Sequence, residues 1–285
     1  MAKKKTSTQQ LRGKEGFELY YHNIFKDRWA DLKEALLREN QSVAWKTYAE
    51  GKEYLLDIGS VCAALALPLE GASRILDMCA APGGKTLVLA SCMEEDAGLV
   101  CNERSRERYG RLLRVLEDHL GEEVRQQIKA ICTDGAQLCL NKDNVYDRIL
   151  LDAPCSSERH VLTSPHYLDQ WSPARIKTLA VSQWALLSSG YRMLSPGGYL
   201  LYATCALSPE ENDKVVSRLE KKFDDAEFMD TLPVLPSEHE QLFSQFLPTQ
   251  ELPIPEKTDK GFHILPDTAA GAGPLYFALI HKKEL

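Results

Sequence analysis

From about residue 72 onward, short apolar runs alternate with amphipathic stretches, and this alternation constrains the fold more than any other feature. It favours a mostly parallel sheet with helices on both faces, because each helix returns the chain to the start of the next strand. We expect seven strands, at residues 73–79, 99–102, 128–132, 147–152, 199–203, 262–265 and 275–281. The chain is therefore predicted to be an α/β protein.

The 285 residues divide into three predicted parts. Residues 1–16 are expected to form a flexible basic arm, residues 17–70 an N-terminal helical extension, and residues 71–285 the α/β domain. Within the extension, apolar side chains at helical spacing predict one helix over 17–40 and another over about 52–66. The second helix would carry one apolar stripe, made of Leu55, Ile58, Cys62 and Leu65.

A helix-start signal follows the fifth expected strand. Ser208 is followed by Pro209, at a first helical position, and by Glu211 three residues later, which is the pattern of a capping box. We therefore expect a helix to begin at Ser208. Residues 231–260 carry several prolines and acids and are expected to form a surface excursion.

The net charge of −7 does not by itself favour a nucleic-acid partner, but the charge is unevenly distributed. Residues 209–260 hold 13 acidic and 6 basic residues, which accounts for the whole excess. Two local basic clusters remain, at residues 1–14 and 104–114. A basic face can bind phosphate on an acidic protein, and either cluster could equally be solvated surface.

No apolar run approaches the roughly 18 residues of a membrane span, and no secretory signal is apparent. None of the eight cysteines forms a Cys-x-x-Cys pair or a zinc-like set, so we predict no metal site. We expect most of these cysteines to be buried, reduced thiols. The expected location is intracellular and cytoplasmic, with the mitochondrial matrix as the alternative in a eukaryote.

The first expected strand ends in a loop of small residues that opens a helix. Small residues let a ligand approach the backbone, and a helix N-terminus favours a carboxylate or phosphate. A phosphate loop would need glycine where Cys79 stands, and the G-x-G-x-x-G fingerprint of dinucleotide binding is missing. The candidate ligand-binding residues here are Cys79, Ala80, Ala81, Pro82, Gly83, Gly84 and Lys85.

Acidic residues follow the next two strands. Glu103 stands where an acid can accept both ribose hydroxyls of an adenosine, and Asp134 is placed for the adenine amino group. Each acid alone could be a surface charge or a helix cap. Three strand ends in register around a small-residue loop predict a nucleoside pocket.

Two cysteines and an acid follow the fourth and fifth strands. Asp152 and Cys155 end one strand and Cys205 ends the other, so neighbouring strands should bring both thiols to one rim. A thiolate that adds to carbon 6 of a pyrimidine makes carbon 5 nucleophilic toward a sulfonium methyl. A carboxyl group near N3 assists by hydrogen bonding to the ring. Chemistry alone leaves open which cysteine attacks.

These strand ends resemble the NOL1/NOP2/Sun (RsmB-like) family of RNA cytosine-5 methyltransferases over residues 50–285. The family's motifs are matched in order by residues 76–85 (LDMCAAPGGK), 151–156 (LDAPCS) and 202–205 (YATC), and by Glu211 and Asn212. The tail at residues 264–276 is similar to that of compact, mitochondrial-type members. The resemblance implies a Rossmann-like fold of the class I methyltransferases that use S-adenosyl-L-methionine as cofactor.

The resemblance also implies roles for individual residues. Cys205 would be the nucleophile, Cys155 would help release the product, and Asp152 would act at the base. The family's cofactor contacts correspond to Cys79, Ala80, Ala81, Pro82, Gly83, Gly84, Lys85, Glu103, Asp134 and Asp152. One departure stands at residues 156–160, where many members read S-G-T-G and this chain has a charged loop.

RNA is the expected substrate, with ribosomal RNA favoured over transfer RNA by resemblance only. Because no second RNA-binding domain is visible, a structured RNA or a partner protein would supply much of the specificity. Two alternatives differ in class. One is a methyltransferase acting on DNA or a small molecule, which an assay on RNA and DNA would separate. The other is a non-catalytic cofactor-binding adaptor, which would tolerate loss of Cys205.

Overall fold

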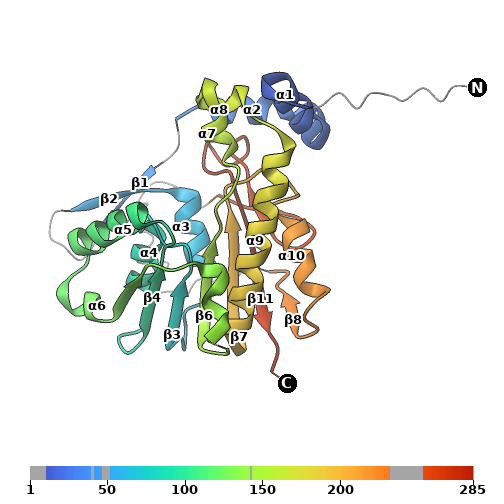
Figure 1. Ribbon diagram of the computed structural model, residues 1–285. Helices are drawn as coiled ribbons and strands as arrows, with labels where there is room; N and C mark the ends of the chain where they lie inside the picture. The colour runs from blue at the N-terminus through green and yellow to red at the C-terminus, as the bar shows by residue number, and fades with distance from the viewer. Residues whose placement is uncertain (1–10, 40–41, 47–51, 142, 232–252, 285) are drawn as a thin grey trace, which may run out of the picture.

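A computed structural model describes residues 11–39, 42–46, 52–141, 143–231 and 253–284. Its central sheet has a parallel half in the order β5-β4-β3-β6-β7 and continues through the antiparallel strand β11 (Figure 1). The parallel strands are β3 (Arg74–Asp77), β4 (Gly98–Asn102), β5 (Ile128–Ile131), β6 (Tyr146–Asp152) and β7 (Leu194–Thr204). The remaining strands are β8 (Ala226–Phe228), β9 (Glu256–Lys257), β10 (Phe262–Ile264) and β11 (Leu275–Lys282).

The expected α/β fold is confirmed, and all seven expected strands belong to the sheet. The strand count of seven is wrong for the described residues, because the sheet there has nine strands. The two additions are β8, which pairs with β11, and β9, which pairs with β10. Strands of two or three residues at a sheet edge carry too little apolar pattern to be recognised from the sequence.

Successive residues of the central strands face opposite sides of the sheet, and each side is apolar. On β7, Leu201 and Ala203 belong to one buried cluster, whereas Leu200 and Tyr202 belong to the other. A strand buried on both faces must be apolar at every position, which explains its continuous hydrophobic run. The helices that cover the two faces include α3 (Ile58–Leu65), α4 (Gly84–Cys92), α5 (Arg106–His119), α9 (Pro173–Met193) and α10 (Asp213–Glu220).

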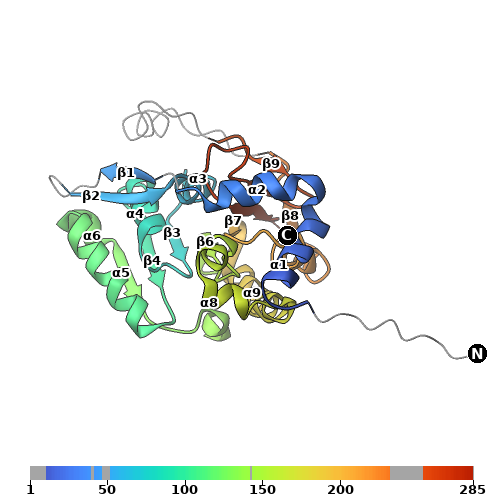
Figure 2. The same cartoon turned by 90° about the horizontal axis from the view of Figure 1, so that it is seen from above.

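The N-terminal helices α1 (Gly13–Phe25) and α2 (Trp29–Leu37) lie beyond the carboxyl ends of the parallel strands (Figures 1 and 2). They pack against the loop helices α7 (Glu158–Thr163) and α8 (Pro165–Asp169). A third buried cluster joins these segments, with Phe17, Tyr21, Trp29, Leu32, Leu36, Val161, Trp171 and Leu207 among its members. The extension therefore forms one wall above the sheet. Its division from the α/β domain at residue 70 stays a prediction.

The helix expected over residues 52–66 is wrong in its first half. Residues Glu53–Asp57 form strand β2, which pairs antiparallel with β1 (Ser42–Lys46), and only Ile58–Leu65 is helical. Leu55, counted on the apolar stripe, is 71% exposed. Asp57 ends the strand and caps the helix, since its side chain accepts a hydrogen bond from Ser60 N at 3.0 Å.

The helix expected over 17–40 is divided by a 3₁₀ turn at Lys26–Arg28, and its first part begins at Gly13. The predicted arm 1–16 thus lies partly in α1, and residues 1–10 lie outside the described residues. Most of the predicted excursion at 231–260 also lies outside them. No helix within the described segments is both long and apolar enough to cross a membrane.

The packing of α2 gives a stability prediction with an internal control. Leu32 is fully buried and Leu37, on the same helix, is 52% exposed. We expect Leu32→Ala to lower the free energy of unfolding by about 2–5 kcal/mol, because it removes buried methyl groups and leaves a cavity. Leu37→Ala should cost less than about 0.5 kcal/mol. Equal midpoints in urea unfolding would contradict the burial of this extension.

Candidate active site

The carboxyl ends of the parallel strands meet at one edge of the sheet, and the loops there carry every residue singled out in the sequence. The β3–α4 turn holds residues 79–83, β4 leads to Glu103, and β5 leads to Asp134. Asp152 is the last residue of β6, and Cys205 directly follows β7. Open parallel sheets bind ligands at this edge.

The turn after β3 requires both of its glycines. Gly83 has φ +121°, a backbone conformation that side chains other than glycine rarely adopt, and an added Cβ would lie 2.9 Å from Val115 Cγ1. At Gly84 an added Cβ would collide with the side chain of Leu56 on β2. The small residues of this loop therefore let α5 and the β1–β2 hairpin close onto it.

A cavity of about 260 Å³ opens between the ends of β3, β4 and β5, and it has the chemistry of a nucleoside site. Cys79, Glu103, Asp134 and Gly135 line it. Glu103 Oε1 accepts from Ser105 N at 2.8 Å, whereas the buried Oε2 accepts no hydrogen bond from any described residue. A carboxylate oxygen that forms an ion pair but accepts no hydrogen bond can still accept one from a ribose hydroxyl.

Arg108 lines the same cavity, and the sequence analysis placed it only in the basic cluster at 104–114. Its guanidinium lies 3.2 Å from Glu103 Oε2 and donates to Ala81 O at 2.5 Å, so it links the acid to the small-residue loop. The basic cluster at 104–114 is therefore not a uniform phosphate-binding face. Arg111 pairs with Glu107 at 3.3 Å, and Arg104 lies 3.9 Å from Asp134.

Two more cavities lie next to the nucleoside-sized one along the same sheet edge. A cavity of about 190 Å³ lies between the β3–α4 loop and the β1–β2 hairpin and shares Cys79 with the first. A larger cavity of about 560 Å³ shares four lining residues with the second, namely Asp57, Ser60, Lys85 and Asp152. The three cavities form a row along this sheet edge, called the trough below, with Glu103 in the lining at one end and Cys205 at the other. Such a trough can hold a nucleoside at one end and a second molecule at the other.

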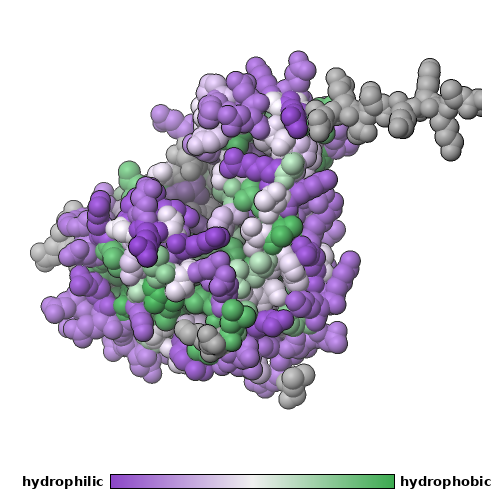
Figure 3. Space-filling model, in the orientation of Figure 1, coloured by the Kyte–Doolittle hydropathy of each residue, from purple (hydrophilic) through white to green (hydrophobic). Residues whose placement is uncertain are grey.

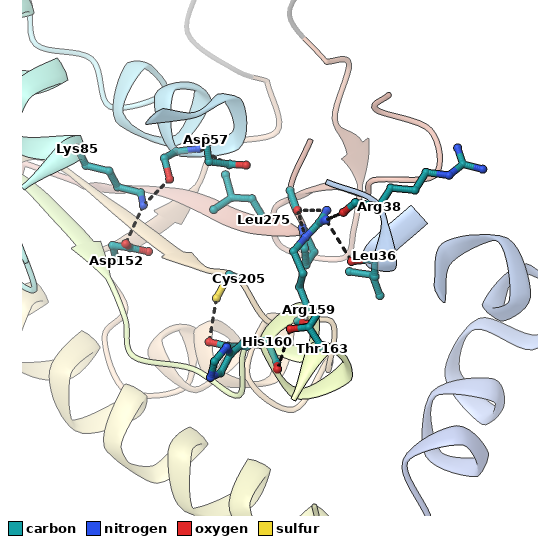
Figure 4. A pocket seen from close by; sticks show the side chains of 14 residues that line it. Leu36, Arg38, Asp57, Lys85, Asp152, Arg159, His160, Thr163, Cys205 and Leu275 are labelled. Atoms are coloured by element: carbon teal, nitrogen blue, oxygen red, sulfur yellow. Dashed lines mark hydrogen bonds and ion pairs between the residues drawn. The ribbon is translucent and has the colours of Figure 1, made fainter. Parts of the chain in front are cut away.

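Lys85 and Asp152 form an ion pair where the second and third cavities meet (Figure 4). Lys85 Nζ donates to Asp152 Oδ2 at 2.7 Å and to Ser60 Oγ at 3.1 Å. Burial lowers the pKa of Lys85, but the adjacent Asp152 outweighs it and leaves a net raised pKa, so the ammonium persists. The Lys85–Asp152 pair therefore lies beside the large cavity, which Cys205 also lines.

The two cysteines from neighbouring strand ends are in contact. Strands β6 and β7 are parallel neighbours with Asp152 opposite Ala203, and Cys155 Sγ lies 2.8 Å from Cys205 Sγ. The hydrogen bond to Cys205 and burial raise the pKa of Cys155 well above its usual value. Cys155 is therefore a protonated thiol that can donate to the Cys205 sulfur.

The loop beside the cysteines is strained and firmly anchored. Ser157 has left-handed backbone dihedrals, φ 56° and ψ 64°, and its hydroxyl lies 3.3 Å from Cys205 Sγ. Arg159 donates to the carbonyls of Leu36 and of Gly273, at 3.1 Å and 2.7 Å. It thereby ties the loop to the N-terminal extension and to the C-terminal segment, and all three segments line the large cavity (Figure 4).

The expected helix start at Ser208 is wrong, because α10 begins at Asp213. Residues 208–212 form a turn in which Glu211 N donates to Ser208 O at 3.0 Å. The side chain of Glu211 does not cap a helix. It is fully buried and accepts from Ser156 N at 3.0 Å, in the loop that follows Cys155.

These features define a Rossmann-like α/β domain with a nucleoside-sized cavity and a cysteine pair at the same sheet edge. A profile of the family described as 16S rRNA methyltransferase RsmB/F matches residues 64–265, so the chain belongs to that family. The resemblance stated from the sequence motifs is thereby confirmed.

Individual relatives agree with the family. The chain is 35% identical to the mouse mitochondrial tRNA (cytosine(34)-C(5))-methyltransferase, over 81% of this chain and 64% of that protein. It is 31% identical to mouse 5-cytosine rRNA methyltransferase NSUN4, over 80% and 60%. It thus spans about three fifths of the length of these relatives. A methyltransferase homolog from Pyrococcus horikoshii shares the fold, with a TM-score of 0.67, 22% identity and coverage of 93% and 95%.

The cysteine contact predicts a specific cross-link. A mild thiol oxidant should join Cys155 to Cys205 before other pairs, because their sulfur atoms already lie within contact distance. Peptide mapping by mass spectrometry should find this disulfide. Cys155→Ser should abolish it and leave the other thiols reduced. A cross-link between Cys205 and a different cysteine would contradict the arrangement.

Proposed function

We propose that this chain is an S-adenosylmethionine-dependent RNA cytosine-5 methyltransferase that forms a covalent bond between Cys205 and carbon 6 of the target base. One observation carries the proposal: Cys205, in contact with Cys155, lines a cavity that is linked through shared lining residues to a nucleoside-sized cavity. Membership of a methyltransferase family and the names of the relatives support it.

The trough fits S-adenosyl-L-methionine. Glu103 would accept the ribose hydroxyls, Asp134 would lie near the adenine, and residues 79–85 would surround the amino-acid part. Lys85 and Asp152 lie where that part of the trough meets the cysteine cavity. When bound, the cofactor supplies an electrophilic methyl group that would be transferred to carbon 5 of the cytosine.

Cys205 would act first. Its thiolate adds to carbon 6 of the cytosine, the carbon 5–carbon 6 double bond is lost, and electron density moves toward carbon 5 and N3. Asp152, 32% exposed beside the same cavity, can hydrogen-bond to the edge of the ring that carries N3. The adjacent Lys85 ammonium offsets the negative charge that develops there.

Cys155 would act last. After methyl transfer, carbon 5 carries both the new methyl group and its original proton, and a base must take that proton. The carbon 6–sulfur bond then breaks, the ring double bond returns, and Cys205 leaves as a thiolate. Because Cys155 keeps its proton, it can donate a hydrogen bond to the departing sulfur. The retained proton therefore suits Cys155 to release of the product and leaves attack to Cys205.

The substrate would be a cytosine in RNA, unstacked so that it reaches the large cavity. We favour ribosomal RNA because the family is described by it, although one relative is named for transfer RNA. Figure 3 shows hydrophilic residues over much of one face, with hydrophobic residues gathered in its lower part. A partner protein that adds RNA specificity, and a location in the mitochondrial matrix or cytoplasm, belong to the same proposal.

Two cysteine variants test the mechanism. Cys155→Ala should accumulate a covalent RNA adduct when the cofactor is supplied, because attack proceeds while release is slowed. Cys205→Ala should form no adduct and should transfer no methyl group. Denaturing gel electrophoresis with labelled RNA measures both outcomes. Normal turnover by Cys205→Ala would exclude Cys205 as nucleophile and would favour a non-covalent enzyme.

A further inference from the structure

Two buried carboxyl groups lie behind the cysteine pair. Glu158 begins α7, three residues after Cys155, and Glu211 lies in the turn six residues after Cys205. Both side chains have 0% exposure. Within the part of the chain that the structure describes, neither carboxyl has an ion-pair partner among the lysines, arginines and histidines. Two buried negative charges without a cation would be strongly unfavourable.

Ser156 lies between the two carboxyl groups, and its contacts require an additional proton. Its Oγ contacts both Glu158 Oε1 and Glu211 Oε2. A serine hydroxyl has one hydrogen and can donate to only one of them. The other carboxyl must therefore be protonated and must itself donate to Ser156 Oγ.

The remaining hydrogen bonds indicate which carboxyl carries the proton. Glu158 accepts from the Tyr21 hydroxyl on Oε1 and from Leu207 N on Oε2, so donors face both of its oxygens. Glu211 accepts from Ser156 N and from Gln183 Nε2, at 3.0 Å and 2.9 Å, and both donors face Oε1. The proton therefore belongs on Glu211 Oε2, with Glu158 ionised.

Glu158 and Glu211 connect the segment that follows Cys155 with the segment that follows Cys205. Glu158, from the Cys155 side, holds Leu207 N, which is two residues after Cys205. Glu211, from the Cys205 side, holds Ser156 N, which is next to Cys155. Each segment thus supplies the carboxyl that binds the other segment. Loss of the shared proton would put two like charges on either side of Ser156 and would drive the segments apart.

We propose that Glu158 and Glu211 share one proton through Ser156, and that this proton holds Cys155 and Cys205 at their working separation. Both glutamates are positioning residues, because neither lines the cavities of the trough. The catalytic part of this inference rests on the proposed function. The shared proton itself does not depend on it.

The two glutamates lose their shared proton in a lower pH range than the neighbouring tyrosines and Cys155 lose theirs. Burial raises the pKa of both glutamates, that of Glu211 to about 7, while hydrogen bonds from Ser156, Tyr21 and Leu207 oppose the shift at Glu158. The titratable groups that face the pair from other elements are Tyr20 and Tyr21 on α1, Tyr202 on β7 and Cys155. Burial raises the pKa of each tyrosine, and the hydrogen bond to Cys205 raises that of Cys155, so all four keep their protons near neutral pH.

The direction of the stability effect follows from the raised pKa. Glu211 binds its proton more tightly in the folded protein than at its usual pKa of 4.5. Its contribution to stability is therefore complete below about pH 4.5 and is lost as the pH rises through about 7. A neutral isostere at this position should remove that part of the pH dependence.

Glu211→Gln is that isostere. Its amide oxygen can accept from Ser156 N and Gln183, while its NH₂ group donates to Ser156 Oγ at every pH. We expect methyl transfer within about threefold of the wild type at low pH. As the pH rises, the variant should become more stable and more active relative to the wild type measured at the same pH. Unfolding in urea across this pH range and methyl transfer to RNA measure the two effects.

Glu158→Gln is the matched control. Its NH₂ group either meets Leu207 N, which can only donate, or faces Tyr21, whose hydroxyl must then turn to accept and give up its present hydrogen bond. We therefore expect roughly tenfold or greater loss of methyl transfer at every pH. If the Glu211→Gln protein keeps the wild-type pH slope of stability, or if the two variants behave alike, the shared proton is excluded. A wild-type protein without methyl transfer would instead overturn the proposed function, since the stability profile needs no activity.

Discussion

The parallel pairing of β6 with β7 is the constraint on which the rest of the site depends. It sets Asp152 opposite Ala203, so the segments that leave these strands begin side by side. Cys155 and Cys205, fifty residues apart, therefore meet with 2.8 Å between their sulfur atoms. Both strands are buried on their two faces, which fixes their register through side-chain packing. A slip of either strand would separate the thiols.

The acidic groups around this pairing are kept in different states by their surroundings. Asp152 is paired with Lys85, whose Nζ lies 2.7 Å away. Burial raises the pKa of Asp77 and of Glu211 to about 7. Carboxyl groups within one sheet edge can therefore serve as an ionised ring contact, as hydrogen-bond acceptors and as proton carriers. The number and position of nearby donors decide which role each takes.

The sequence predicted the sheet and the residues at its strand ends, because buried parallel strands and small-residue loops leave strong local patterns. Contacts between distant segments left weaker signals. Tyr54 and Leu56 line the trough from β2, a segment for which the apolar spacing predicts helix, and nothing in the sequence around Glu158 indicates a buried partner. Glu211 matched a capping box, yet tertiary contacts with Ser156 and Gln183 hold it elsewhere.

The protein is proposed to methylate cytosine in RNA, with the paired cysteines activating and releasing the base beside the cofactor trough. Bisulfite sequencing of total RNA, from cells with and without the protein, tests it most directly. The account predicts one or a few cytosines that resist conversion only when the protein is present, and that become reactive when Cys205 is replaced. Identical conversion in all samples, or protection that survives the loss of Cys205, would contradict it.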